Sequence, residues 1–376
     1  MRSLIQLKNK NNSKISKQCL NYLSPDFIYI PYPEGASVKA KSKDIINKET
    51  ILLTKEKTKI YSPVSGQIMG ACEMQVGKKL VRTIVIENDF REKTTSIKGT
   101  KKYISKYSKE AVLDLVNTFN VYQGAFVGKT LVINGMDNEP GVITSSYIIS
   151  QYPNEILETI DALCTIFDFH KCFLAIKNND SENVETLVNH IGTYPNISLQ
   201  LMPDLYPLGH KDILIKELVL PRKLKEGVIY LTAEELYAIY SVLKKGRPIT
   251  EKYVTIAGDM IENPAIVKVK IGTSLKDIIV SNFKLIQEDY QIVINGLMGG
   301  YEVNNLDFVI TTDTNSIFIN SINLIPEQSC INCGLCHAKC PVGCDPRTKK
   351  LAGCIKCGAC SYVCPAKINF KERMVK

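Results

Sequence analysis

The sequence predicts a multidomain protein of mixed α/β and β class that ends in a small cysteine-rich segment. Three observations lead to this expectation. Residues 26–92 consist of short apolar runs broken by glycine and proline. Residues 111–248 alternate between strand-like and helix-like periods, and residues 249–322 carry strand-like runs around one short helix. The chain has 376 residues, enough for several domains, and nine of its thirteen cysteines lie in residues 323–376.

The first part, residues 26–92, reads as short strands joined by turns, which is typical of a small barrel or sandwich. Residues 1–25 lack this pattern and are predicted to be an irregular lead-in. The turn at Ser62–Gly66 resembles that of biotinyl and lipoyl carrier domains, so Lys55 is either a modified carrier lysine or a solvated hairpin lysine. Strands are expected at residues 27–30, 51–53, 59–61, 67–69 and 81–86.

The middle of the chain is predicted to hold a parallel sheet. Residues 93–110 are rich in Lys, Ser and Thr and are expected to be a linker. Strands that alternate with helices favour a parallel sheet with right-handed crossovers in residues 111–248. The expected strands are 129–134, 172–177, 197–201 and 227–231, and the expected helices are 155–167, 181–190 and 233–244.

Residues 249–322 change character again and are predicted to form a β-grasp-like unit. Two hairpin strands, a helix and two returning strands are expected there. Their places are 253–258 and 265–270 for the hairpin, 274–280 for the helix, and 292–294 and 308–310 for the returning strands.

The cysteine-rich segment, residues 323–376, contains the pattern C-x2-C-x2-C-x3-C-P twice. In two-cluster ferredoxins, the fourth cysteine of such a run ligates the cluster of the other run. The sequence therefore predicts two [4Fe–4S] clusters. Cluster 1 is assigned to Cys330, Cys333, Cys336 and Cys364, and cluster 2 to Cys354, Cys357, Cys360 and Cys340.

The cysteines also allow other interpretations. A zinc ribbon could use Cys333, Cys336, Cys354 and Cys357, but it would leave four cysteines of the repeat without a role. A disulfide framework needs an oxidising compartment, and nothing indicates secretion. Cys344 is predicted to be a spare thiol and His337 to tune a cluster from nearby. The scattered cysteines, expected to be buried separately, are Cys19, Cys72, Cys164 and Cys172.

A second candidate site follows the first strand of the predicted parallel sheet, where ligands bind at the carboxyl ends of strands. The loop Asn134-Gly-Met-Asp-Asn-Glu-Pro-Gly141 combines turn formers with two carboxylates. A tight turn without a ligand is the alternative, because turn formers alone predict turns. The candidate residues for binding FMN or NADH are Asn134, Gly135, Asp137, Glu139 and Gly141.

The order of these parts resembles the RnfC-like family, which comprises the C subunit of the Rnf electron-transport complex and soluble relatives such as the proline reductase-associated electron-transfer protein. The resemblance implies a barrel-sandwich hybrid, a Rossmann-like domain, a ligand-binding β-grasp (SLBB-like) domain and a dicluster ferredoxin domain. The residues that carry it are Ser62–Gly66, Ile84–Asn88, Asn134-Gly135, Glu139-Pro140, Tyr206-Pro207 with Gly209, Ala257-Gly258-Asp259, Gly299-Gly300 and the double cysteine repeat.

One departure from the family concerns flavin. The family places a loop of the form G-x-G-G-x-G-F-P-T before the first strand, where glycine lets backbone amides reach the FMN phosphate. Here the region reads Tyr122-Gln-Gly-Ala-Phe-Val-Gly-Lys129, which is shorter and poor in glycine. FMN binding is therefore doubtful, and with it direct oxidation of NADH.

The leading functional hypothesis is an electron-transfer protein that relays single electrons through two [4Fe–4S] clusters between a donor and an acceptor protein. The alternative is an FMN-dependent, NADH-oxidising subunit of an Rnf-type membrane complex. The net charge of +9 suits a solvated surface, an acidic redox partner or an anionic membrane surface. No basic–aromatic motif indicates nucleic acid. No apolar run predicts a membrane span or a secretory signal, so a cytoplasmic location is expected, either free or peripheral on a membrane complex.

Overall fold

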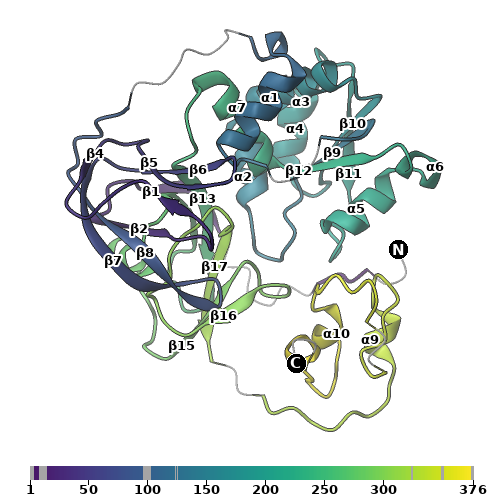
Figure 1. Ribbon diagram of the computed structural model, residues 1–376. Coiled ribbons are helices and arrows are strands. Elements are labelled where there is room, and N and C mark those ends of the chain that lie inside the picture. The colour runs from purple at the N-terminus through teal and green to yellow at the C-terminus, as the bar shows by residue number, and fades with distance from the viewer. Residues whose placement is uncertain are drawn as a thin grey trace.

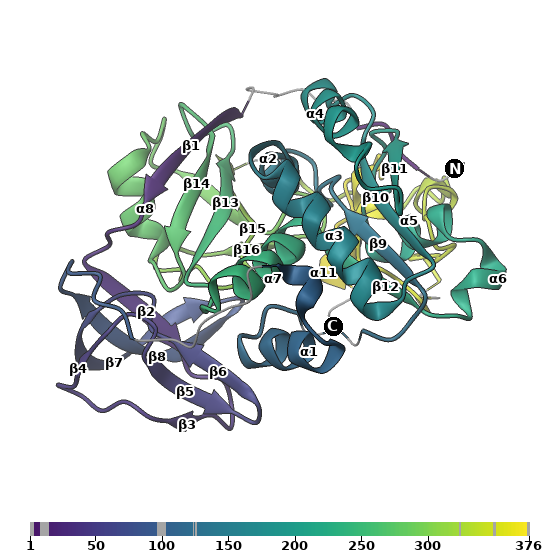
Figure 2. The ribbon, with the colours of Figure 1, turned by 90° about the horizontal axis from the view of Figure 1, so that it is seen from above.

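The computed structural model describes residues 4–7, 15–95, 103–122, 124, 126–322, 325–348 and 351–373. Parts of the predicted lead-in and linker, and Gln123 and Ala125 of the shortened loop, lie outside these residues. An α/β domain lies next to two β-rich units, and the cysteine-rich segment packs below it (Figure 1). The view from above separates the β-rich units on one side from the parallel sheet on the other (Figure 2). The predicted mixed α/β class is confirmed.

The first β-rich unit is built from two small antiparallel sheets, of order β2-β8-β7-β4 and β3-β5-β6. Ile68 of β7 and Ile84 and Ile86 of β8 are buried together with Leu52 and Leu53 of β5, so the core of this unit lies between the two sheets. Lys55 is exposed at the end of β5, next to the turn into β6. The strands are β2 (Phe27–Pro31), β3 (Ser37–Val38), β4 (Ile45–Ile46), β5 (Ile51–Lys55), β6 (Thr58–Tyr61), β7 (Gly66–Val76) and β8 (Lys79–Asn88).

The α/β domain has a sheet of four parallel strands in the order β11-β10-β9-β12, as the alternating pattern predicted. Every residue of the central strand β9 is buried. Its elements are η1 (Ile104–Lys106), α1 (Lys109–Thr118), β9 (Thr130–Asn134), α2 (Thr144–Gln151), α3 (Pro153–Phe167), β10 (Lys171–Lys177), α4 (Ser181–Ile191), β11 (Ile197–Met202), α5 (Lys211–Leu218), α6 (Pro221–Leu224), β12 (Val228–Thr232) and α7 (Ala233–Lys245).

The third unit is a six-stranded mixed sheet of order β1-β14-β13-β17-β15-β16. The helix α8 covers it with Leu275, Ile278 and Ile279. This unit contacts the first β-rich unit through the bridge of Gln75 with Phe308, and it contacts the α/β domain through β13 and α2. Its elements are β1 (Ser16–Tyr22), β13 (Glu251–Ala257), β14 (Ala265–Lys270), α8 (Leu275–Asn282), β15 (Tyr290–Ile294), β16 (Tyr301–Val303) and β17 (Ser316–Ser321).

Two sequence expectations about this sheet are wrong. Ser16–Tyr22 lies in the predicted irregular lead-in but forms β1, which pairs in parallel with β14. Its largely polar residues do not show the apolar alternation that identifies a strand. The strand forms because it pairs with the edge of β14. Residues 308–310 were predicted to be a strand but make only isolated bridges, and the returning strand is β17. A buried apolar triplet in a loop cannot be distinguished from a strand by its period.

The prediction that Cys164 and Cys172 are separately buried thiols is also wrong. The two form a disulfide, with Cα atoms 6.9 Å apart. Helix α3 ends at Asp168, which adopts a left-handed conformation, and the chain then turns back into β10. This reversal brings the last turn of the helix beside the start of the strand. A separation of eight residues in sequence does not reveal it.

A buried ion-pair network joins the first β-rich unit to the six-stranded sheet. Lys270 is 2% exposed, and its Nζ lies 2.9 Å from an oxygen of Glu251 and 3.2 Å from one of Glu92. Burial alone would raise the pKa of Glu251, but the hydrogen bonds and charges of Lys270 and Lys268 lower it to about 2. The carboxylate is therefore held ionised between the two lysines.

Replacing Lys270 by methionine (Lys270→Met) should lower the free energy of unfolding by about 2 kcal/mol, because it removes the buried cation of the network. Glu251 keeps Lys268 and Glu92 keeps Lys48, so neither carboxylate is left without a partner. Lys284→Met is the matched control. That lysine pairs with Glu262 at 2.7 Å on the exposed surface, and its loss should leave the unfolding midpoint nearly unchanged. Denaturant unfolding at neutral pH measures both. Equal costs for the two variants would mean that the network contributes nothing beyond a surface pair.

Candidate functional site

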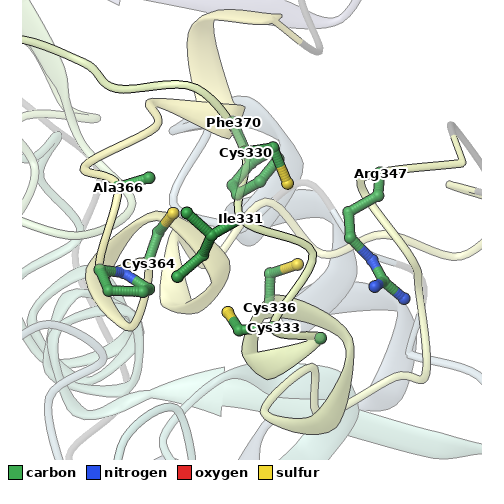
Figure 3. A pocket seen from close by; sticks show the side chains of 10 residues that line it. Cys330, Ile331, Cys333, Cys336, Arg347, Cys364, Ala366 and Phe370 are labelled. Atoms are coloured by element: carbon green, nitrogen blue, oxygen red, sulfur yellow. The ribbon is translucent and has the colours of Figure 1, made fainter.

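The cysteine-rich segment brings the first three cysteines of one run and the last cysteine of the other into a single pocket. Cys330, Cys333, Cys336 and Cys364 line about 270 Å³ of empty space, part of it continuous with solvent (Figure 3). The first run supplies a loop and α9 (Leu335–Ala338), and Cys364 follows α10 (Ala359–Tyr362). Ile331, Phe370 and Arg347 complete the wall.

The geometry of the two short helices explains how the runs interlock. Gly334 and Gly358 precede them with φ of 75° and 74°, a conformation that suits glycine. Each helix is a single turn, so the fourth cysteine of its run lies two residues past the helix end, and Cys364 lines the pocket of the other run. The apolar side chains that support this arrangement are Ala366, Ile368 and Phe370, and α11 (Phe370–Arg373) ends the described chain.

The other four predicted ligands, Cys340, Cys354, Cys357 and Cys360, also lie near one another. Burial raises the pKa of the Cys357 thiol to about 11, and the neighbouring Cys360, Cys340 and Cys354 add to the shift. An unligated thiol here is therefore neutral, and a metal centre would have to replace its proton. The backbone amide of Lys356 also donates to Cys354 Sγ, at 3.4 Å.

Cys344, predicted to be a spare thiol, is 4% exposed and lies within this second group. Its amide donates to Cys340 Sγ at 3.2 Å, and the His337 ring nitrogen Nδ1 lies 3.1 Å from its carbonyl oxygen. Burial, followed by the influence of Cys340 and Cys354, raises the pKa of the Cys344 thiol to about 11. Spacing alone could not reveal this contact, because Cys344 has no counterpart in the second run.

The zinc interpretation finds no support in this arrangement. Cys333 and Cys336 line the first pocket, whereas Cys354 and Cys357 belong to the second group. Within the part of the chain that the structure describes, no three His, Cys, Asp or Glu side chains converge on one ion-sized point. A four-iron cube instead takes its thiolates at separate corners and does not require them to converge.

The two groups are exposed in different ways. All four cysteines of the second group are half-buried, whereas in the first group Cys336 and Cys364 are buried, at 5% and 8%. Cys330 and Cys333 are exposed, and so are the neighbouring Ile331 and Leu335, at 64% and 42%. The second group faces the body of the protein. A Cβ added at Gly358 would lie only 2.3 Å from the carbonyl oxygen of Met298, in the loop between β15 and β16. Two cysteines of the first group are therefore open to solvent, and the second group is held against the folded domains.

The predicted nucleotide-site residues lie at the carboxyl end of β9. Asn134, Asp137 and Glu139 line a pocket with about 400 Å³ of empty space. Asn134 donates to Tyr230 and to the carbonyl of Gly209, both at 2.8 Å. Gly135 packs below the sheet edge, where its amide donates to the carbonyl of Ala175. The other residues that line this pocket are Asn138, Val142, Thr144, Ser145, Thr232, Glu234 and Asn315.

Asp137 already occupies the amino end of helix α2. Its carboxylate accepts hydrogen bonds from the amides of Ser145 at 2.7 Å and Ser146 at 3.1 Å. Burial raises the pKa of Asp137 to about 6, and these amide bonds oppose the shift. A helix amino end at this place of a parallel sheet is the usual site for a phosphate. Here the protein's own carboxylate fills it.

Glu139 is likewise engaged by the protein. Its oxygens accept the amide of Met298 at 2.9 Å and the amide of Gly299 at 3.0 Å, together with the hydroxyl of Tyr206 at 3.0 Å. Burial raises the pKa of its carboxyl, and the two amides oppose the shift. Gly141, the last predicted residue, has a φ of 76° and packs against Phe318. The loop is thus a junction between domains as well as a pocket wall.

These residues do not fit the phosphate of FMN. Three carboxylates, from Asp137, Glu139 and Glu234, line the pocket, and none of its described lining residues is a lysine or arginine. The described residues of the shortened loop pack against one another and against the domain. Phe126 stacks on Phe167 with ring centroids 4.8 Å apart, and Tyr122 packs edge-on against Phe126. The described part of the loop is therefore folded onto the α/β core.

The chain is similar to known redox proteins. Residues 115–243 match the family of the Nuo51 FMN-binding domain. The C subunit of the ion-translocating oxidoreductase complex of Buchnera aphidicola subsp. Acyrthosiphon pisum is 26% identical over 82% of this chain and 70% of the relative. The corresponding subunits from Pectobacterium atrosepticum and Rhodobacter capsulatus are 28% and 26% identical over 60% and 58% of this chain. The resemblance to the RnfC-like family is confirmed.

The share of the relative that this chain spans differs among these subunits. The chain spans 34% of the Pectobacterium subunit and 44% of the Rhodobacter subunit. A chain of the NAD+-reducing [NiFe]-hydrogenase superposes on half of this one with a TM-score of 0.42 and 15% identity, which is too weak to carry an argument. The match to an FMN-binding domain runs against the doubt about flavin that the shortened loop raised. Of the helices that the structure describes, none has the length and apolar character of a membrane span.

Proposed function

We propose that this chain is an electron-transfer subunit of an Rnf-type oxidoreductase complex and that it relays single electrons through two [4Fe–4S] clusters. The observation that carries the proposal is the entry of Cys364, from the second run, into the pocket of the first. This crossing is the ligation pattern of two-cluster ferredoxins. It also favours iron over a zinc ribbon, which would have no use for it.

Four cysteines would hold each cluster. The clusters would supply one-electron redox chemistry, and the protein would set their potentials through hydrogen bonds, charge and exposure. The amides of Cys344 and Lys356, which donate to Cys340 and Cys354, are such hydrogen bonds in cluster 2. The ligands are Cys330, Cys333, Cys336 and Cys364 for cluster 1, and Cys354, Cys357, Cys360 and Cys340 for cluster 2.

The exposure of the first group suggests where a partner binds. Cys330 and Cys333 are open to solvent beside the apolar Ile331 and Leu335, so cluster 1 would exchange electrons with another protein. The basic charge of the chain favours an acidic partner, either a subunit of an ion-translocating complex or a soluble reductase. The names of the relatives support the former, in which the chain would lie peripherally on the cytoplasmic face of the membrane.

The second candidate function is an FMN-dependent, NADH-oxidising subunit. The match of residues 115–243 to an FMN-binding domain favours it. The engaged carboxylates of Asp137 and Glu139 and the shortened glycine loop disfavour it. Flavin would convert a hydride into single electrons for the clusters. Without flavin, the electron donor must be another protein.

Cofactor analysis of anaerobically purified protein tests the proposal. About eight irons and eight acid-labile sulfides per chain, as two cubane clusters require, are expected with negligible FMN. The isolated protein should then not oxidise NADH. Zinc in place of iron would refute the cluster assignment. Near-stoichiometric FMN, or tight binding of added FMN, would instead establish the flavoprotein function.

A further inference from the structure

We propose that Glu139 is a positioning residue for the second cluster: through Tyr206 and the Met298-Gly299 peptide it holds the Cys357 loop in place and sets the reduction potential of that cluster. This inference rests on the two-cluster function proposed above. It assigns to Glu139 a role other than contact with a nucleotide. The basis is a three-way junction of the α/β domain, the six-stranded sheet and the cysteine-rich segment.

The junction is built around one hydroxyl. Tyr206 is 7% exposed, and its oxygen lies 3.0 Å from Glu139 Oε1 and 2.5 Å from the carbonyl oxygen of Cys357. The hydroxyl hydrogen is therefore shared between a carboxylate and the peptide of a proposed cluster ligand. The Tyr206 ring packs with Ala359 and Ile5, and Met298, Cys357 and Val363 border this small apolar cluster.

The second arm of the junction is the loop between β15 and β16. Both oxygens of Glu139 accept hydrogen bonds from the amides of Met298 and Gly299. The same loop lies against the cysteine-rich segment, because Gly358 meets the Met298 carbonyl and Gly299 lies near the backbone of Lys356. The carboxylate thus fixes both surfaces on which the Cys357 loop rests.

Two effects of opposite sign follow. The negative charge of Glu139, separated from the Cys357 peptide by one hydroxyl, disfavours an added electron on the second cluster, since Coulomb interactions are strong where water is excluded. The Tyr206 hydroxyl withdraws charge from the Cys357 carbonyl, which favours an added electron. Removing the carboxylate charge should raise the potential, and removing the hydroxyl should lower it.

The experiment measures the reduction potentials of both clusters by EPR-monitored titration of the anaerobic holoprotein. Glu139→Gln should raise the potential of cluster 2, and Tyr206→Phe should lower it. A tenfold change in the reduction equilibrium is expected in each case, which is about 59 mV for one electron. Cluster 1 serves as the internal reference and should not change. Glu262→Gln, which removes an exposed carboxylate paired with Lys284, is the matched control.

Three other outcomes would overturn the inference, and each is distinct. If both variants raise the potential of cluster 2, the junction acts only by excluding water from that cluster. If neither potential moves while the affinity for added FMN or NADH falls in Glu139→Gln, the residue is a nucleotide ligand. If the wild-type protein holds no iron–sulfur clusters, the proposed function itself fails, and this result is separate from a failure of the junction.

Discussion

Replacing Cys336 and Cys364 together by alanine should leave about four of eight irons, because both belong to the pocket of cluster 1. Replacing Cys360 and Cys364 together should remove nearly all the iron, because these two cysteines come from one run but serve different clusters. The contrast tests the crossed ligation directly. If each run ligated its own cluster, the two results would be exchanged.

Iron and acid-labile sulfide per chain are the measurements, and low-temperature EPR of the reduced protein identifies the remaining cluster. Alanine is chosen because serine retains an oxygen that could still bind iron. Cys344→Ala is the informative control, since this buried cysteine touches Cys340 but has no place in the repeat. It should keep about eight irons, as two cubane clusters require. Loss of one cluster in this control would make Cys344 a ligand and require a new assignment.

Local periodicity was enough to predict most of the fold. The strands β9, β10, β11 and β12 are apolar runs between helices, and a parallel sheet is the standard way to bury such runs. β1 could not be predicted, because its residues are largely polar and its place depends on the edge of β14, far along the chain. The disulfide of Cys164 and Cys172 depends in the same way on a helix end that reverses the chain.

The candidate site was predictable to a different extent. The double repeat predicts the two groups, because in two-cluster ferredoxins the fourth cysteine of each run ligates the cluster of the other run. The spacing says nothing of exposure, which distinguishes Cys330 and Cys333 from the other six predicted ligands. The sequence shows that the loop after β9 contains the carboxylates of Asp137 and Glu139. It does not show their hydrogen-bond partners, because the amides of Ser145 and Met298 approach them only in the tertiary fold.

The hydrogen bonds that these carboxylates accept affect how the α/β domain is interpreted. A sequence match to an FMN-binding domain reports the arrangement of strands and helices, whereas a phosphate needs free amides and positive charge. In this chain Asp137 and Glu139 accept hydrogen bonds from such amides themselves. The domain can therefore resemble an FMN-binding domain in sequence while it serves as a support on which the second cysteine group rests.

The close approach of Gly358 to the loop between β15 and β16 gives the second large prediction. Gly358→Ala should release the cysteine-rich segment from the body of the protein, because the added Cβ would lie 2.3 Å from the Met298 carbonyl oxygen and 3.0 Å from its carbon. Backbone atoms cannot move aside as a flexible side chain can. The left-handed conformation adds a cost of about 1–2 kcal/mol.

Gly334→Ala is the matched variant, because Gly334 occupies the equivalent place in the first run with nearly the same φ. Its added Cβ would meet only Arg347 Nη1, at 3.7 Å, so it carries the conformational cost alone. Limited proteolysis and iron content compare the two. Gly358→Ala should be cut before residue 330 and lose the second cluster, whereas Gly334→Ala should resist cleavage. Equal resistance would mean that the segment is held elsewhere, and the contact of Tyr206 with the Cys357 carbonyl would then be the principal attachment.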